Sequence, residues 1–375
     1  MDISNLKIGR EGTFVPPFKS NINALKGYEK DGFDSIFFAD HLMNWVPESI
    51  WTPDITNLAN VFDSPHMLYD VFAMMTTAAL NTKKIRLGTG VTETFRRHPA
   101  VVAQTMLTVD ELSRGRVILG MGTGEKENTV PYGIKFEKPV GRFEESLIII
   151  RKLWESDKKI DYDGKFWKLR NAVLSIKPFK KNKLPPIWIA SHGPRMLEIT
   201  GRLGDGWLPI MVKPGVYKEK FEIIRNSAQQ AGRNPDDITP ALIACVIIDE
   251  DPAECEKMLE STMMKNILIP LYREDFKPYG LSHPLGENID GTIEFIPTNF
   301  DRNTILDLIS KIPTQMCRDF YLNGTPDDLI GQIESYVKNS GVKHIVLFNC
   351  SILCALEKIP TSNLCMQKVI KYFKK

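Results

Sequence analysis

The chain has 375 residues, and its 48 Lys and Arg residues nearly balance 46 Asp and Glu residues, leaving a net charge of +2. This balance argues against nucleic acid as the main partner, because nucleic-acid binding relies on a strongly basic surface. No apolar run approaches the roughly 20 residues that span a bilayer, and the polar start of the chain is not a signal peptide. We therefore expect a cytoplasmic protein without a membrane span.

The six cysteines contain no Cys-x-x-Cys pair. Three of them, Cys350, Cys354 and Cys365, lie close together in the sequence. We expect buried free thiols here rather than zinc ligands, which is consistent with a reducing cytosol. No metal site is predicted.

Strand and helix signals alternate along the first third of the chain. The strands are predicted at 6–8, 35–39, 85–91 and 117–119, and the helices at 21–30, 67–80 and 99–112. Apolar runs without alternation, such as 117–119, are typical of strands buried on both faces of a parallel sheet. Pro99 suits a helix start, where its missing N–H is harmless. Successive βα units of this kind indicate a parallel sheet.

The alternation continues to the end of the chain. Strands are predicted at 186–190, 206–209, 241–248 and 344–348, helices at 142–154, 195–202, 217–231, 252–265 and 329–340, and an outlying hairpin at 159–169. Residues 269–300 break the pattern with several prolines, and a loop of that length is usually functional. Eight strands favour a single (β/α)8 TIM barrel over 1–375, with insertions after several strands and an inserted segment at about 269–300. The alternative is an open doubly wound sheet.

The loops that follow the strands of a barrel share one face, so residues far apart in sequence meet there. A histidine and a tryptophan, His41 and Trp45, follow one strand, and Glu125 follows another. Together they form an acid/base set beside an aromatic wall. Each residue alone also has a structural explanation, such as a backbone-bonded histidine, a loop anchor or a solvated carboxylate. Their coincidence at one face favours a functional site.

Residues 191–194, Ser-His-Gly-Pro, carry a different signal. A glycine followed by a proline at a helix start presents free backbone N–H groups, which suit a phosphate. Basic residues lie nearby, at Lys177, Lys180, Lys181, Lys183 and Arg195. Most of these lysines are equally well explained as a solvated surface.

An ordered set of motifs resembles the luciferase-like superfamily. The set comprises 38–41 with Trp45, 88–92 leading to 98–104, 115–125, and 189–194. It more closely resembles the members that use the deazaflavin coenzyme F420, namely phthiodiolone ketoreductases and F420-dependent alcohol and glucose-6-phosphate dehydrogenases. The similarity covers nearly the whole chain.

The resemblance implies an F420-dependent oxidoreductase that transfers a hydride between the deazaflavin and the carbonyl or alcohol carbon of a small-molecule substrate. It implies either a ketoreductase or a secondary-alcohol dehydrogenase, as a homodimer. Catalytic roles fall on His41, Trp45 and Glu125. Cofactor contacts fall on Asp40, Gly90, Val91, Thr92, Thr123, Gly124 and Asn128, with the cofactor phosphate at Ser191, His192, Gly193 and Pro194. It also implies a cis peptide between Gly90 and Val91.

Other functions remain open on the same barrel. One is a methylene-tetrahydromethanopterin reductase that also uses F420, although the pair of His41 and Trp45 favours an alcohol or a ketone. Another is a monooxygenase with FMN as the alternative cofactor. A cofactor carrier without catalysis is not favoured, because His41 and Glu125 are both present. The apolar content of 269–300 suggests a lid over a larger, less polar ketone.

Overall fold

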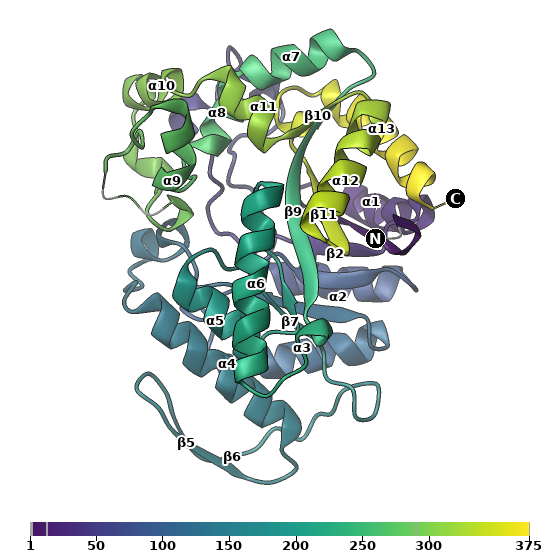
Figure 1. The fold of residues 1–375 in the computed structure, drawn as a ribbon, viewed down its shortest axis with the longest axis vertical. Coiled ribbons are helices and arrows are strands. Elements are labelled where there is room, and N and C mark those ends of the chain that lie inside the picture. The colour runs from purple at the N-terminus through teal and green to yellow at the C-terminus, as the bar shows by residue number, and fades with distance from the viewer. Residues whose placement is uncertain (1–2, 13, 288, 290, 375) are drawn as a thin grey trace.

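Eight parallel strands close into a barrel in the computed structural model, which describes residues 3–12, 14–287, 289 and 291–374 (Figure 1). They are β1 (Lys7–Gly12), β2 (Ser35–Phe38), β3 (Arg86–Thr89), β4 (Val117–Met121), β7 (Ile187–Ile189), β8 (Gly206–Trp207), β9 (Thr239–Ile248) and β11 (His344–Asn349). Each pairs with the next in this order, and β11 pairs with β1 to complete the ring. The predicted TIM barrel is confirmed, and the open sheet is wrong.

Several barrel strands are buried over their whole length. All residues of β2 and β4 are buried. Inside the ring, large side chains such as Phe37, Ile118 and Trp188 fill the interior. Gly88 makes room for them, since a Cβ atom there would lie 2.5 Å from the Phe37 ring. The ring is therefore a packed core with its free space at one end.

Helices cover the outside of the barrel (Figure 1). They are α1 (Phe18–Asp31), α2 (Val71–Asn81), α3 (Pro99–Ser113), α4 (Pro139–Glu155), α5 (Pro194–Leu203), α6 (Pro214–Gln230), α12 (Pro326–Ser340) and α13 (Lys358–Phe373). The helix predicted at 67–80 begins later, at Val71, because the carboxylate of Asp70 caps it by accepting from the backbone N–H groups of Phe72 and Ala73. The helix α13 was not predicted. Among the described residues, no helix is long and apolar enough to cross a membrane.

A large excursion between β9 and β11 packs around its own apolar cluster, which includes Phe276 and Phe295. Its elements are α7 (Pro252–Glu260), α8 (Thr262–Leu268), α9 (Arg273–Phe276), α10 (Arg302–Ser310), α11 (Thr314–Phe320) and β10 (Leu322–Gly324). The single helix predicted at 252–265 is wrong, because Ser261 ends α7 and its hydroxyl caps α8 by accepting from Met264 N. The strand β10 pairs with the far end of β9, so the excursion is joined to the barrel by a shared strand.

The hairpin predicted at 159–169 is present as β5 (Ile160–Asp163) and β6 (Lys168–Ala172), which pair antiparallel outside the barrel. Figure 1 shows it at the edge of the molecule remote from the excursion.

Candidate active site

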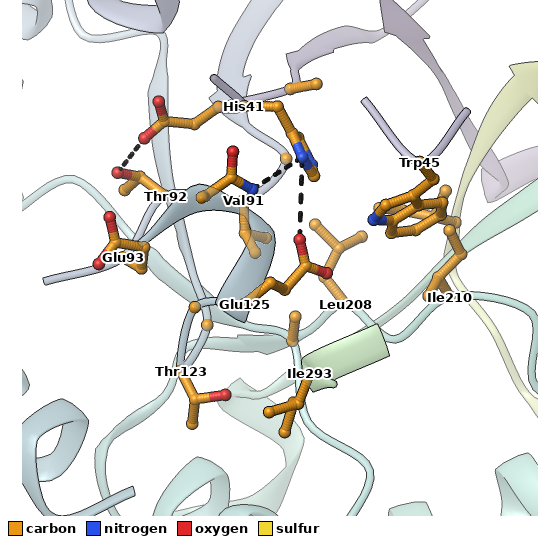
Figure 2. A pocket seen from close by; sticks show the side chains of 18 of the residues that line it. His41, Trp45, Val91, Thr92, Glu93, Thr123, Glu125, Leu208, Ile210 and Ile293 are labelled. Carbon is orange, nitrogen blue, oxygen red and sulfur yellow. Dashed lines mark hydrogen bonds and ion pairs between the residues drawn. The ribbon is translucent and has the colours of Figure 1, made fainter. Parts of the chain in front are cut away.

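A pocket of about 1200 Å³, open solvent at its mouth included, lies at the carboxyl ends of the barrel strands. Its lining includes most of the residues that the sequence predicted for the site, namely Asp40, His41, Trp45, Gly90, Val91, Thr92, Thr123, Gly124, Glu125, Asn128 and His192. Ser191, Gly193 and Pro194 do not line it. Figure 2 shows polar groups around His41, Glu125 and Glu93, facing an apolar wall with Trp45, Leu208 and Ile210.

His41 lies just beyond the end of β2, after Ala39 and Asp40, and is held by Asn128. The amide oxygen of Asn128 accepts from the backbone N–H groups of Leu42 (2.7 Å) and Met43 (3.2 Å), so its amide nitrogen must face the other way. That nitrogen lies 3.0 Å from His41 Nδ1 and can only donate. The same Nδ1 atom also lies 3.2 Å from the backbone oxygen of Met43, which can only accept, so the two contacts favour opposite tautomers of the neutral ring.

Trp45 stands at right angles to His41, with 5.9 Å between the ring centres. Its indole Nε1 donates to Glu127 Oε1 over 3.2 Å, and its backbone oxygen accepts from Asn266 Nδ2 over 3.1 Å. The indole ring and the backbone of Trp45 are thus each held by a hydrogen bond, which fixes this wall of the pocket.

Glu127 is a site residue that the sequence did not reveal. It lies in the 3-10 turn η4 (Lys126–Asn128), and its side chain is fully buried. His41, Glu125 and Glu127 each place a nitrogen or oxygen within 4.8 Å of the others. The Asn128 amide nitrogen lies 3.0 Å from His41 Nδ1 and donates to Glu127 Oε1 over 3.1 Å, so it joins these side chains in one hydrogen-bond network.

Glu11 is a second site residue that was not predicted. The strand predicted at 6–8 continues to Gly12, which carries Glu11 to the pocket. Burial raises the pKa of Glu11 to about 8, although the neighbouring Arg10 works in the opposite direction. Glu11 is thus a protonated acid around neutral pH, and its Oε2 atom has no partner among the described residues.

Asp40 and Thr92 line the pocket, but their side chains are hydrogen-bonded to each other. Thr92 Oγ1 donates to Asp40 Oδ2 over 2.6 Å, and Arg97 Nη1 donates to the same oxygen over 2.6 Å. Arg96 joins this network through the Asp40 backbone oxygen and through Glu93. These ion pairs tie the ends of β2 and β3 together beneath the pocket.

The glycine-rich stretch after β4 lies against the end of β3. The peptide between Gly90 and Val91 is cis, as expected. A Cβ atom on Gly120 would lie 1.9 Å from the backbone oxygen of Thr89, and Gly124 has a φ of 82°, which only glycine adopts freely. The residues 122–124 therefore present a nearly bare backbone beside Val91, a surface that fits a flat ring.

The segment 191–194 is split by the fold. The Ser191 hydroxyl is buried against Thr200 Oγ1 at 2.9 Å, while Gly193 and Pro194 begin α5. His192 alone turns to the pocket, and burial, aided by Lys220, lowers its pKa to about 3. Nearby, Arg195 and Arg202 both pair with Glu144.

The chain belongs to the luciferase-like monooxygenase family, whose model matches residues 5–344. It is a luciferase-like oxidoreductase, as the motifs indicated.

Relatives and solved structures give the comparison more detail. The phthiodiolone/phenolphthiodiolone dimycocerosates ketoreductase of Mycobacterium tuberculosis (strain H37Rv) is 38% identical over 366 residues, 96% of each chain. The 5,10-methylenetetrahydromethanopterin reductase of Archaeoglobus fulgidus is 32% identical over 347 residues, 91% of this chain and 92% of the relative. The structure of an F420-dependent secondary alcohol dehydrogenase with an F420-acetone adduct superimposes with a TM-score of 0.74 at 21% identity, over 97% of this chain and 99% of that one. This last likeness concerns the fold alone.

Proposed function

We propose that the protein is an F420-dependent ketoreductase or secondary-alcohol dehydrogenase. The observation that carries the proposal is the arrangement of His41, Trp45 and Glu125 at the lining of one pocket. The bound deazaflavin would supply or accept two electrons as a hydride. The 38% identity to a ketoreductase supports this reading.

His41 would act at the substrate oxygen. A ring proton of His41 would be given to a carbonyl oxygen during reduction and taken back from a hydroxyl during oxidation. Trp45 would pack over the reacting carbon and keep water from it, because its indole and its backbone are each held by a hydrogen bond. Glu125, 3.8 Å from His41 Nδ1, would stabilise the charge on the imidazole ring.

The bare backbone of residues 122–124 and the side chain of Val91 would hold the flat ring of the cofactor. His192, which carries no charge around neutral pH, would contact it from the side. The phosphate would lie toward the start of α5, near Arg195, which is largely exposed.

The substrate would be a ketone with a substantial apolar part. Leu208, Ile210, Ile293 and Phe348 form an apolar wall opposite His41. The basic residues that could hold a sugar phosphate point elsewhere, since Arg273 and Lys277 pair with Glu274, and Arg302 pairs with Asp54. None of these three lines the pocket.

A substrate panel tests the proposal. Purified protein is offered ketones of increasing chain length, sugar phosphates and methylene-pterins with F420, and in parallel FMN with oxygen. We expect ketone reduction or alcohol oxidation with F420 and no oxygen uptake with FMN. Activity confined to the pterin, or oxygen uptake with reduced FMN, would show that the proposal is wrong. The homodimer remains a prediction, and analytical ultracentrifugation tests it.

A further inference from the structure

Glu127 is a buried carboxyl group whose two oxygens have different surroundings. Oε1 accepts from Trp45 Nε1 at 3.2 Å and from Asn128 Nδ2 at 3.1 Å. Oε2 is buried and has no hydrogen-bond partner within the described part of the chain. A carboxylate with one unpartnered buried oxygen is costly, whereas a carboxylic acid turns that oxygen into a donor.

The charges around Glu127 also favour the acid. The titratable groups that face it are Glu125 from the preceding strand end, His41 from the loop after β2, and Tyr132 from the 3-10 turn η5 (Val130–Tyr132). Over the described ranges, no Lys or Arg nitrogen lies within 4.0 Å of its carboxyl oxygens, and the adjacent Lys126 pairs with Glu294 instead. Burial raises the pKa of Glu127 well above its usual range, and the Glu125 carboxyl raises it further.

We propose that Glu127 and Glu125 hold a single proton between them, and that Glu127 is a positioning residue for Trp45 and His41. Two neighbouring carboxyl groups share a proton because ionising both places like charges side by side. Glu125 is the acidic neighbour that would accept this proton, since one oxygen of each group lies within 4.8 Å of the other and a side-chain movement would bring the two into hydrogen bonding.

The pair would matter for catalysis in the reaction proposed above, and this part rests on that proposed function. Negative charge develops on the carbonyl oxygen as the hydride adds to its carbon. With one proton, the two carboxyl groups carry a single negative charge beside His41. Two negative charges there would oppose the build-up of negative charge on the carbonyl oxygen. Oε1 meanwhile remains the acceptor that fixes the Trp45 indole and, through Asn128, the His41 ring.

Infrared titration of the protein without substrate tests the shared proton. Glu11 is also protonated around neutral pH, so the measurement uses Glu11→Gln as the background. We expect the carbonyl stretch of a buried carboxylic acid to persist well above the usual titration range of a glutamate in this background, and to disappear on adding Glu127→Gln. A spectrum that Glu127→Gln leaves unchanged would overturn the proposal. This measurement needs no substrate. Its outcome therefore tests the shared proton independently of the proposed ketone reduction.

Kinetics test the positioning role. Glu127→Gln keeps an acceptor for Trp45 and Asn128 and a donor toward Glu125, so we expect its turnover to lack the decline that ionisation of Glu127 causes as the pH rises. Glu127→Leu removes the acceptor, and we expect a loss of about 10- to 100-fold, the usual range for groups that orient a catalytic residue. A purely structural role would leave the pH profile of Glu127→Gln the same as wild type, and that result would contradict the inference.

Discussion

Lys126 and Glu294 connect the rim of the pocket to the excursion, with 2.5 Å between the ammonium nitrogen and a carboxylate oxygen. Lys126 follows Glu125 directly. Glu294 follows the 3-10 turn η8 (Gly291–Ile293), whose Ile293 side chain lines the pocket (Figure 2). The ion pair thus holds an apolar wall residue of the excursion over the candidate active site.

Breaking this pair with Lys126→Ala or Glu294→Gln should raise the KM for a bulky ketone more than it changes kcat. Both side chains are about one-third exposed (31% each), and such pairs contribute only about 0–1 kcal/mol, so we expect at most about a fivefold effect. The charge-swapped double variant, Lys126→Glu with Glu294→Lys, should restore the KM. A swap that behaves like the single variants would contradict the role of the pair.

Replacing His41 by Ala should lower turnover by about 100- to 10,000-fold, the usual contribution of a general acid or base. Binding of F420, followed by fluorescence titration, should be nearly unchanged. The matched control is His98→Asn, because His98 lies outside the pocket as the N-cap of α3 and Asn caps helices well. Unchanged turnover of His41→Ala on a ketone would rule out the assigned role.

Glu11 should make the protein less stable as the pH rises. Burial raises the pKa of this carboxyl from 4.5 to about 8, so the folded protein keeps a proton that the unfolded chain releases. The free energy of unfolding should therefore fall between these two pH values, by up to about 1.4 kcal/mol per pH unit. Urea unfolding at several pH values should show a shallower fall in Glu11→Gln. Parallel curves for the two proteins would show that Glu11 ionises normally.

Gly88 should not tolerate a side chain. An added Cβ would lie 2.5 Å from the Phe37 ring inside the barrel, and overpacking of this kind costs about 1–3 kcal/mol. We expect Gly88→Ala to lower the free energy of unfolding by this amount. Gly27→Ala is the control, since nothing lies within 4 Å of an added Cβ there and a glycine inside α1 weakens the helix by about 0.5–1 kcal/mol. It should be slightly stabilising.

F420 should bind more tightly than FMN, and added salt should weaken its binding, because its tail is anionic and exposed charges are screened within about 8 Å at physiological ionic strength. Arg195 and Arg202 share one carboxylate, Glu144, which leaves a positive charge near the start of α5. Arg195→Gln should reduce the salt dependence. Arg225→Gln is the control: Arg225 lies on α6 and pairs with Asp236, and its replacement should leave the salt dependence unchanged. Equal affinity for both cofactors would contradict the prediction.

The barrel could be predicted from the sequence because strands buried on both faces leave uninterrupted apolar runs, as in β4. The pocket residues could be predicted because strand ends of a barrel share one face. His41, Trp45 and Glu125 meet there as expected, although their catalytic roles stay predictions.

Two buried carboxyl groups and the surroundings of Ser191 could not be predicted from the sequence, because they depend on tertiary packing. Glu127 lies in the charged stretch 125–127, which is typical of a solvated loop, and only tertiary packing buries it. Glu11 was missed because the charged pair of Arg10 and Glu11 interrupts the apolar run of β1. The hydroxyl of Ser191 was expected at a phosphate, but it is occupied by Thr200.

The length of β9 has a consequence for engineering the protein. Residues Leu322–Gly324 of β10 pair with Val246, Ile247 and Ile248 at the far end of that strand. Deleting the excursion to make a minimal barrel would remove β10 from the end of β9. The backbone N–H and C=O groups of β9 that pair with β10 would then have no partner. Exposed apolar edges recruit other chains, so a shortened protein should self-associate unless β10 is kept or the edge is given charged side chains.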